Sequence, residues 1–164
     1  MERILEKTVK LKSGPAMPVL GLGTWKLTGS TCEQTVRKAI DLGYRHIDTA
    51  EMYGNEAEIG KAIRDTDRGR LFITSKVSSA NLASYDVVKA CHQSLDRLGT
   101  DYLDLYLLHW PNDAIPLDQT MEGMQKLAAE GTVRSIGVSN FDVDRMQEAI
   151  AASEAPICNN QVEY

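Results

Sequence analysis

The sequence predicts an α/β protein in which parallel strands alternate with helices, and two observations support this fold class. Short apolar runs recur along the chain, and between them lie segments whose apolar residues are spaced by three and four positions. Such alternation implies a parallel sheet covered by helices, either open or closed into a barrel. The chain has 164 residues, of which 43% are hydrophobic, so we expect a single domain over residues 1–164.

The strand assignments begin with a β-hairpin. Residues 8–11 and 17–20 are apolar runs, and the segment 12–16 between them is rich in turn-forming residues. The alternating pattern starts after this hairpin. Its six expected strands are residues 21–24, 44–48, 71–76, 103–108, 135–138 and 157–162.

The helix assignments depend on apolar spacing and on glycines that suit a left-handed helix end, namely Gly43, Gly99 and Gly131. The apolar positions of the five expected helices are Val36, Ala39 and Ile40; Ile59, Ala62 and Ile63; Val87, Cys91, Leu95 and Leu98; Met121, Met124 and Ala128; and Val143, Met146 and Ile150.

Polar residues at the strand ends favour a barrel over an open sheet. They are Asp48, Lys76, His109, Ser139 with Asn140, and Gln161. Each group lies at the carboxyl end of a different expected strand, and in a barrel those ends converge on one mouth, where (β/α)8 enzymes place their chemistry. The run 21–26 also lacks the third glycine of a dinucleotide-binding G-x-G-x-x-G turn. We therefore expect a (β/α)8, TIM-barrel type of fold preceded by a β-hairpin.

Six ordered motifs make the sequence similar to the aldo-keto reductase family from about Val9 to Tyr164. They are GLGTWK from Gly21, HIDTAEMYGNEAEIGKAI from His46, ITSKV from Ile73, LLHWP from Leu107, GVSNF from Gly137 and NNQVEY from Asn159. The resemblance is greatest to prokaryotic reductases of small sugar-derived and dicarbonyl substrates. It implies a barrel with the hairpin across its bottom, and reduction of aldehydes or ketones by NADPH, with NADH as the alternative, without a metal.

The resemblance implies four catalytic residues, whose chemistry is consistent with carbonyl reduction. Hydride delivery to a carbonyl builds negative charge on its oxygen, so the site needs a proton donor there. Tyr53 is the expected donor, and the ammonium of Lys76 is expected to lower its pKa by stabilising the tyrosinate. Asp48 would hold Lys76 charged, and His109 would orient the carbonyl by a hydrogen bond.

The resemblance also implies residues that bind the cofactor and the substrate. Thr24, Asp48, Ser139, Asn140 and Gln161 match cofactor positions, of which the last three would hydrogen-bond the nicotinamide carboxamide. Trp25, Tyr53, His109 and Trp110 match substrate-pocket positions.

Structural interpretations compete with these assignments. A single lysine at a strand end is commonly a solvated rim residue, a single tyrosine after a strand commonly packs, and Asp48 with Thr49 could cap a following turn. Both tryptophans could be half-buried packing residues. Four catalytic matches at family spacing on successive strand ends favour the functional interpretation.

Composition and charge exclude several classes of function. The net charge of −5 comes with no basic run, so we expect neither nucleic acid nor an anionic membrane as a partner. The sequence shows no secretory signal and no membrane span, which predicts a cytoplasmic protein that acts on a small carbonyl compound. Cys32, Cys91 and Cys158 form no C-x-x-C pair, so neither a zinc site nor a disulfide framework is expected.

The resemblance implies a longer barrel, of about 250 residues, whereas this sequence ends after the sixth expected strand. The remainder would supply two strands, an aromatic residue against the nicotinamide, basic residues for the adenosine 2′-phosphate and a substrate loop. Three explanations stay open: a fragment of a longer reductase, a chain completed by a C-terminal fragment or a second copy, and a stable truncated form without activity. The last would be a binding or structural module on the same scaffold.

Overall fold

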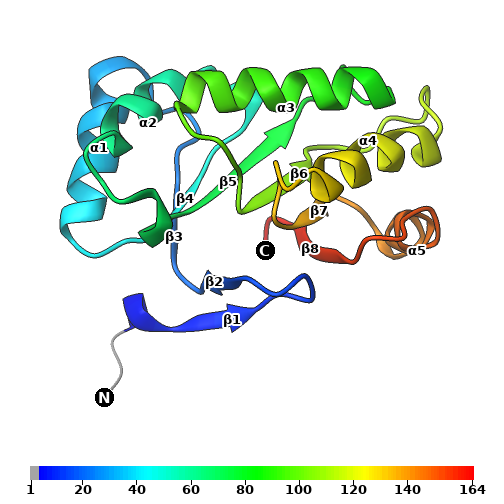
Figure 1. Cartoon of the computed structure of the whole chain (residues 1–164), viewed down its shortest axis with the longest axis horizontal. Helices are drawn as coiled ribbons and strands as arrows, with labels where there is room; N and C mark the ends of the chain where they lie inside the picture. The colour runs from blue at the N-terminus through cyan, green and yellow to red at the C-terminus, as the bar shows by residue number, and fades with distance from the viewer. Residues whose placement is uncertain (1–3) are drawn as a thin grey trace.

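The computed structural model describes residues 4–164 and contains parallel strands that alternate with helices (Figure 1). The strands are β1 (Thr8–Lys10), β2 (Ala16–Pro18), β3 (Gly21–Gly23), β4 (His46–Asp48), β5 (Phe72–Val77), β6 (Leu105–Leu108), β7 (Ile136–Ser139) and β8 (Ile157–Gln161). The α-helices are α1 (Gly29–Asp41), α2 (Glu56–Ile63), α3 (Ser84–Leu98), α4 (Leu117–Ala129) and α5 (Val143–Ala151). Short 3-10 turns cover Ile4–Glu6, Glu51–Tyr53 and Arg68–Arg70.

The main sheet of the described residues has the strand order β3-β4-β5-β6-β7-β8, and every neighbouring pair is parallel. Each strand therefore pairs with the next strand along the chain, and one helix connects each pair. This is the strand order that a (β/α) barrel requires, so the predicted fold class is confirmed. β3 and β8 form the two edges of this sheet.

A hydrogen bond across the sheet shows that the sheet is curled. In a flat sheet β4 and β8 would lie about 19 Å apart, because three strands separate them. Yet Nε2 of Gln161, at the end of β8, donates to Oδ2 of Asp48, at the end of β4, at 2.9 Å. The carboxyl ends of these distant strands therefore meet, as the barrel interpretation predicted.

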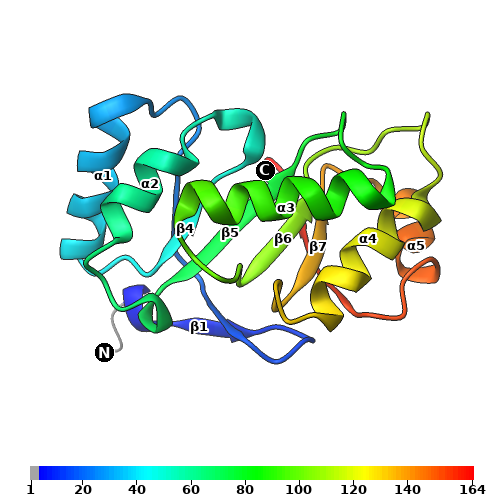
Figure 2. The same ribbon diagram turned by 45° about the horizontal axis from the view of Figure 1, so that its top comes forward.

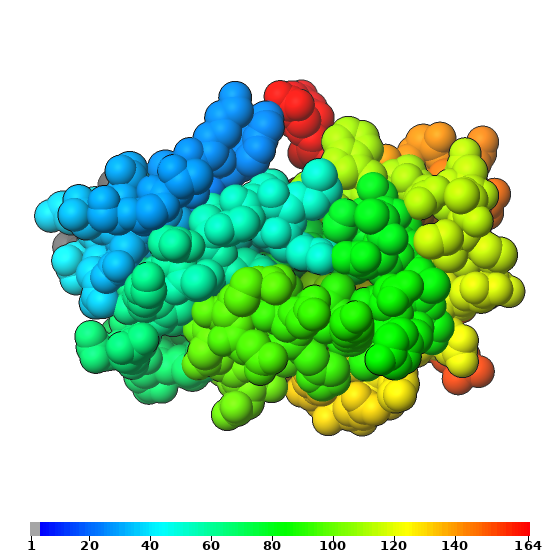
Figure 3. All heavy atoms as spheres, turned by 90° about the horizontal axis from the view of Figure 1, so that it is seen from above, coloured from blue at the N-terminus to red at the C-terminus, as the bar shows by residue number. Residues whose placement is uncertain are grey.

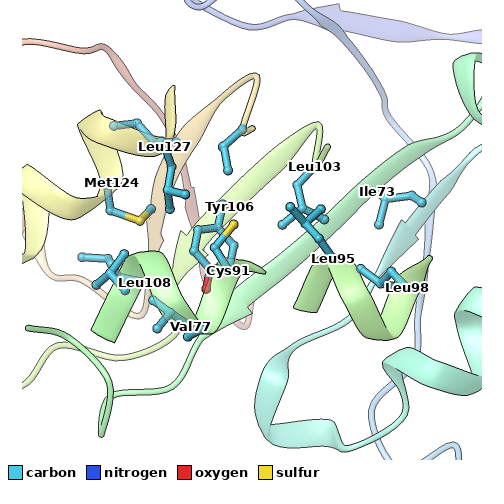
Figure 4. Close-up of a cluster of buried hydrophobic side chains, with 14 of the residues drawn as sticks. Ile73, Val77, Cys91, Leu95, Leu98, Leu103, Tyr106, Leu108, Met124 and Leu127 are labelled. Carbon is cyan, nitrogen blue, oxygen red and sulfur yellow. The ribbon is translucent and has the colours of Figure 1, made fainter. Parts of the chain in front are cut away.

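The main core lies between the convex face of the sheet and the helices. α3 buries Cys91, Leu95 and Leu98 on the outward side chains of β5 and β6, such as Ile73 and Tyr106 (Figure 4). The left-handed Gly99 ends this helix as predicted, with φ of 65°. The alternation of side chains along a strand separates this apolar face from the concave face.

The N-terminal hairpin β1-β2 crosses below the sheet (Figure 2). Leu11, just after β1, enters the concave side of the sheet and packs against Phe72, Leu105 and Leu107. The hydroxyls of Ser13 and Ser135 also share a hydrogen bond of 2.6 Å. The hairpin therefore covers the amino ends of the strands, and the carboxyl ends are left for the site.

Helix α5 buries only part of the apolar face that its sequence predicts. Met146 packs against the core as expected, but Val143 is 71% exposed and Ile150 is 52% exposed. α5 lies at one end of the helix layer and packs on α4 and β8, so only part of its apolar stripe has a neighbour (Figure 1). No helix in residues 4–164 is both long enough and apolar enough to cross a membrane.

Candidate active site

A cavity of about 660 Å³ opens at the carboxyl ends of the strands. Its lining includes Trp25, Asp48, Tyr53, His109, Trp110, Ser139, Asn140 and Gln161. We call this space the mouth cavity. Residues at the C-terminus, drawn in red, lie at the same rim as the blue segment that follows β3 (Figure 3). Strand ends separated by more than 100 residues in the sequence thus share one cavity.

Lys76, at the end of β5, lies beneath the mouth cavity with 1% of its side chain exposed. Its Nζ donates to Oδ1 of Asp48 at 2.5 Å and to the backbone carbonyl of Thr49 at 2.9 Å. Burial lowers the pKa of Lys76 from its ordinary value, while the charge and the hydrogen bond of Asp48 oppose that shift. The expected ion pair is therefore present, and it resists loss of the lysine proton.

Tyr53 is presented by the 3-10 turn Glu51–Tyr53, which Gly54 ends in the left-handed conformation with φ of 65°. Nζ of Lys76 lies 5.1 Å from the centre of the Tyr53 ring, on one of its faces. The ring of His109 meets the Tyr53 ring edge to face, with 5.6 Å between the centroids. The structure thus brings together the four residues that the sequence singled out as catalytic.

The pKa of Tyr53 shifts in the direction opposite to the sequence-based expectation. Burial raises it above its ordinary value, and the negative charge of Asp48 raises it further. Because Asp48 contacts Lys76 directly, much of the lysine charge is offset within the ion pair. In this structure Tyr53 therefore holds its proton more tightly than a free tyrosine does.

His109 follows β6 and is buried, with its backbone N–H donating to the carbonyl of Val77 at 3.1 Å. Burial, and secondarily the charge of Lys76, lower the pKa of His109. Its Nδ1 is a buried atom without a hydrogen-bond partner in the described part of the chain. The imidazole is therefore neutral near pH 7. Because Nδ1 is buried, Nε2 is the ring nitrogen through which His109 can hydrogen-bond a ligand in the mouth cavity.

The three residues expected to bind the carboxamide lie together and hydrogen-bond to their surroundings. The hydroxyl of Ser139 donates to the backbone carbonyl of Gln161 at 2.9 Å, and Nδ2 of Asn140 donates to the carbonyl of His109 at 3.0 Å. Nε2 of Gln161 donates to Asp48. Over residues 4–164, Oδ1 of Asn140 and Oε1 of Gln161 accept no hydrogen bond, so two amide oxygens remain as acceptors for a ligand.

Trp25 and Trp110 line the rim of the mouth cavity, 66% and 50% exposed, so they do not act as buried packing residues. Thr24 lies differently. Its side chain is fully buried, and its hydroxyl and backbone N–H both donate to the carbonyl of Asp48 at 3.0 Å. The structure therefore gives Thr24 a place behind the cavity wall, where it supports Asp48.

The sequence interpretation missed residues that hold the loops of the site. The carboxylate of Glu51 accepts from the N–H of Ser78 at 2.8 Å and from Nδ2 of Asn81 at 2.6 Å. It thus joins the loop that carries Tyr53 to the loop that follows Lys76. Asn55 is 1% exposed and joins the loops after β3 and β4. Both lie within the motif from His46, but their partners come from other loops, so local sequence gives no sign of these contacts.

Comparison with known proteins agrees with this architecture. Parallel strands joined by helices, with polar residues at the carboxyl ends, define a (β/α)-barrel type of protein. The sequence profile of the Aldo/keto reductase family matches residues 19–164. This chain therefore belongs to the aldo/keto reductase family.

Individual relatives agree over most of the chain. Methylglyoxal reductase DkgB of Yersinia pestis is 43% identical over 153 residues, which are 90% of this chain and 57% of that protein. A crystal structure of the thermostable aldo-keto reductase Tm1743 with the inhibitor epalrestat has a TM-score of 0.92 and 44% identity, covering 96% of this chain and 62% of that one. A crystal structure of a Bombyx mori aldo-keto reductase in complex with NADP has a TM-score of 0.91 and 35% identity, and the match covers 96% of this chain and 58% of that one. The chain thus spans about 57% to 62% of the length of these proteins.

Proposed function

We propose that this chain carries the proton-transfer site of a nicotinamide-dependent carbonyl reductase that converts aldehydes or ketones into alcohols. The observation that carries the proposal is the buried Asp48–Lys76 pair with Nζ of Lys76 over the ring of Tyr53, and the ring of His109 edge to face with that same ring. This is an acid, its electrostatic support and an orienting group in one cavity. The family membership and the reductase among the relatives support the same reaction class.

The proton transfer assigned to Tyr53 follows from its surroundings. When bound, the nicotinamide cofactor supplies the hydride. As negative charge develops on the carbonyl oxygen, the phenol of Tyr53 donates its proton there. Its raised pKa keeps that proton in place before reaction. The part of the Lys76 charge that Asp48 does not offset stabilises the tyrosinate that forms afterwards, since Nζ lies 5.1 Å from the ring centre. Asp48 keeps Lys76 protonated between turnovers.

Ligand binding is assigned to the remaining lining residues. The neutral imidazole of His109 can donate a hydrogen bond to the carbonyl oxygen without changing its own charge. The amide oxygens of Asn140 and Gln161 suit the NH₂ group of a carboxamide, and the hydroxyl of Ser139 lies beside them. NADPH is the proposed cofactor, which the NADP-bound relative supports, with NADH as the alternative.

Small aldehydes and dicarbonyl compounds are the proposed substrates. They would bind beside Trp25 and Trp110, which line the mouth cavity. The methylglyoxal reductase among the relatives supports this class. Flat aromatic walls suit a small carbonyl compound because they exclude water from the reacting carbon without requiring many specific polar contacts.

The test is consumption of NADPH in the presence of methylglyoxal or a simple aldehyde. Tyr53→Phe keeps the ring against His109 but removes the proton donor, so it should lower kcat by about two orders of magnitude or more. Tyr85→Phe is the matched control, because Tyr85 is 76% exposed on α3 and lies outside the mouth cavity. An active protein whose rate survives Tyr53→Phe would refute the mechanism.

A second candidate, a binding module without turnover, is favoured by the hydrogen bond from Gln161 to Asp48, which engages two groups otherwise assigned to the cofactor. This candidate predicts a folded protein that does not oxidise NADPH. Intact mass and oligomeric state, measured on the same sample, test the expected completion of the sheet by a C-terminal fragment or a second copy. Turnover by a monomer of 18.1 kDa would exclude both the module and the need for completion.

A further inference from the structure

Residues Thr24–Leu27 form a tight turn between β3 and α1, at the rim of the mouth cavity. The N–H of Leu27 donates to the carbonyl of Thr24 at 3.0 Å, which closes the turn. Lys26, its third residue, has φ of 65°, while Trp25 before it is not left-handed. This is the pattern of a type II turn, whose third residue is normally glycine or asparagine. With lysine there the backbone is strained, so the turn needs support from outside itself.

That support comes from the side chain of Asn55. Its Nδ2 donates to the carbonyl of Thr24 at 2.9 Å and to the carbonyl of Leu27 at 3.0 Å, which are the two ends of the turn. Its Oδ1 accepts from the hydroxyl of Thr49 at 2.8 Å. Both amide hydrogens of a fully buried side chain are thus used on the strained turn.

The position of Asn55 at the start of α2 makes this use of the side chain unusual. Asn55 is the N-cap residue of α2, where an asparagine oxygen normally accepts from an N–H of the first helical turn. Here the side chain makes no capping hydrogen bond. Its hydrogen bonds go to the turn that carries Trp25, which points to a role for Asn55 outside its own helix.

The geometry points to Asn55 as a positioning residue that holds Trp25 at a fixed place relative to Tyr53 by bracing the strained turn Thr24–Leu27. Trp25 is 66% exposed, and Nζ of Lys26 lies over its ring, 4.5 Å from the ring centre. Its place is therefore set mainly by the backbone of the turn. Asn55 follows Tyr53 by two residues, so one side chain links the proposed proton donor to the pocket wall. Any effect of Asn55 on substrate binding through Trp25 rests on the proposed function.

Amide hydrogen exchange of Leu27 measures the turn directly and requires neither cofactor nor turnover. Asn55→Ser removes both donors to the turn but leaves an excellent N-cap for α2, so the helix keeps its start. We expect Leu27 to lose its protection while Tyr106, whose N–H donates to Ser135 inside the core, keeps its own. Thr49→Val is the matched control: it deletes the other hydrogen bond of Asn55 and should leave Leu27 protected.

Glycine at position 26 tests whether strain links the two residues. Lys26→Gly removes the cost of the left-handed conformation, so the double variant Asn55→Ser with Lys26→Gly should regain protection at Leu27. If Asn55→Ser alone does not fold, protection of Leu27 is compared between the double variant and Lys26→Gly. Leu27 that stays protected in Asn55→Ser, or stays unprotected in the double variant, would overturn the proposal.

Kinetics separate this inference from the proposed function. If the chain turns over, Asn55→Ser should raise KM for the aldehyde more than it lowers kcat, whereas Tyr53→Phe should act on kcat. A chain without turnover would remove the substrate role and the proposed function together, and the exchange experiment would still decide whether Asn55 braces the turn. A loss confined to kcat would contradict a role through Trp25.

Discussion

The two faces of β5 and β6 differ in what they contribute to the molecule. On the convex face, Ile73, Tyr106 and their neighbours are fully buried beneath α3 and α4 and form part of one continuous apolar cluster. On the concave face, a small cluster around Leu107 lies above the hairpin, and beyond it the side chains become polar, ending at Lys76. Adjacent residues of one strand therefore serve stability on one side and chemistry on the other.

The same substitution on the two faces should give the largest effect and the clearest contrast. Leu98→Ala, in the closed convex cluster, should lower the free energy of unfolding by about 4 kcal/mol, because the surrounding side chains cannot close the cavity. Leu107→Ala, in the small concave cluster above the hairpin, should cost about 2 kcal/mol, because a cluster of four buried residues can relax more than the large one. Urea denaturation measures both, and equal losses would contradict the proposed difference between the faces.

The buried ion pair should give the next largest effect. Lys76→Met should lower the free energy of unfolding by about 3 kcal/mol, because it leaves the Asp48 carboxylate without its cation. Adding Asp48→Asn removes the stranded charge and should recover part of the loss. If Lys76→Met is as stable as the unaltered protein in thermal and urea unfolding, the pair is more solvated than the structure indicates.

Acid should weaken the concave face through its histidines. Burial lowers the pKa of His46 and of His109 below the ordinary 6.5, so below that pH the unfolded chain binds protons that the folded chain excludes. The free energy of unfolding should then fall as pH decreases from about 7 to 5.5, by up to about 1.4 kcal/mol per pH unit for each histidine. His109→Gln should reduce this slope, and His92→Gln, on the exposed face of α3, is the matched control.

The smallest predicted effect is a gain in stability. The hydroxyl of Tyr106 is buried on the convex face and has no hydrogen-bond partner in the part of the chain that the structure describes. Tyr106→Phe removes that hydroxyl and keeps the ring, so the free energy of unfolding should rise by about 1 kcal/mol. A decrease in the urea midpoint would show that the hydroxyl has a partner after all.

The sequence predicts the strands and their order well, because the signals are local and repeated. The structure confirms all six expected main-sheet strands within a few residues of their predicted ends. Asp48, Lys76 and His109 could be found at their places because a strand end is a local feature, and parallel strands bring such ends to one edge. Motif similarity added Tyr53, which lies in a turn that periodicity alone does not mark.

Three properties could not be predicted, since each depends on distant neighbours. The direction in which the pKa of Tyr53 shifts depends on how closely Asp48 offsets the charge of Lys76. The role of Asn55 depends on a turn about 30 residues earlier in the chain. The exposure of Ile150 depends on which elements cover α5, which its own spacing does not reveal.

The hydrogen bond between Gln161 and Asp48 has a consequence for the order of folding. Lys76 and Asp48 are separated by 28 residues and can meet once β4 and β5 pair, whereas Gln161 lies 113 residues beyond Asp48. Contacts of such long range close late, because the loop entropy is lost before any contact offsets it. The ion pair should therefore form earlier in folding than the hydrogen bond that joins the ends of β4 and β8.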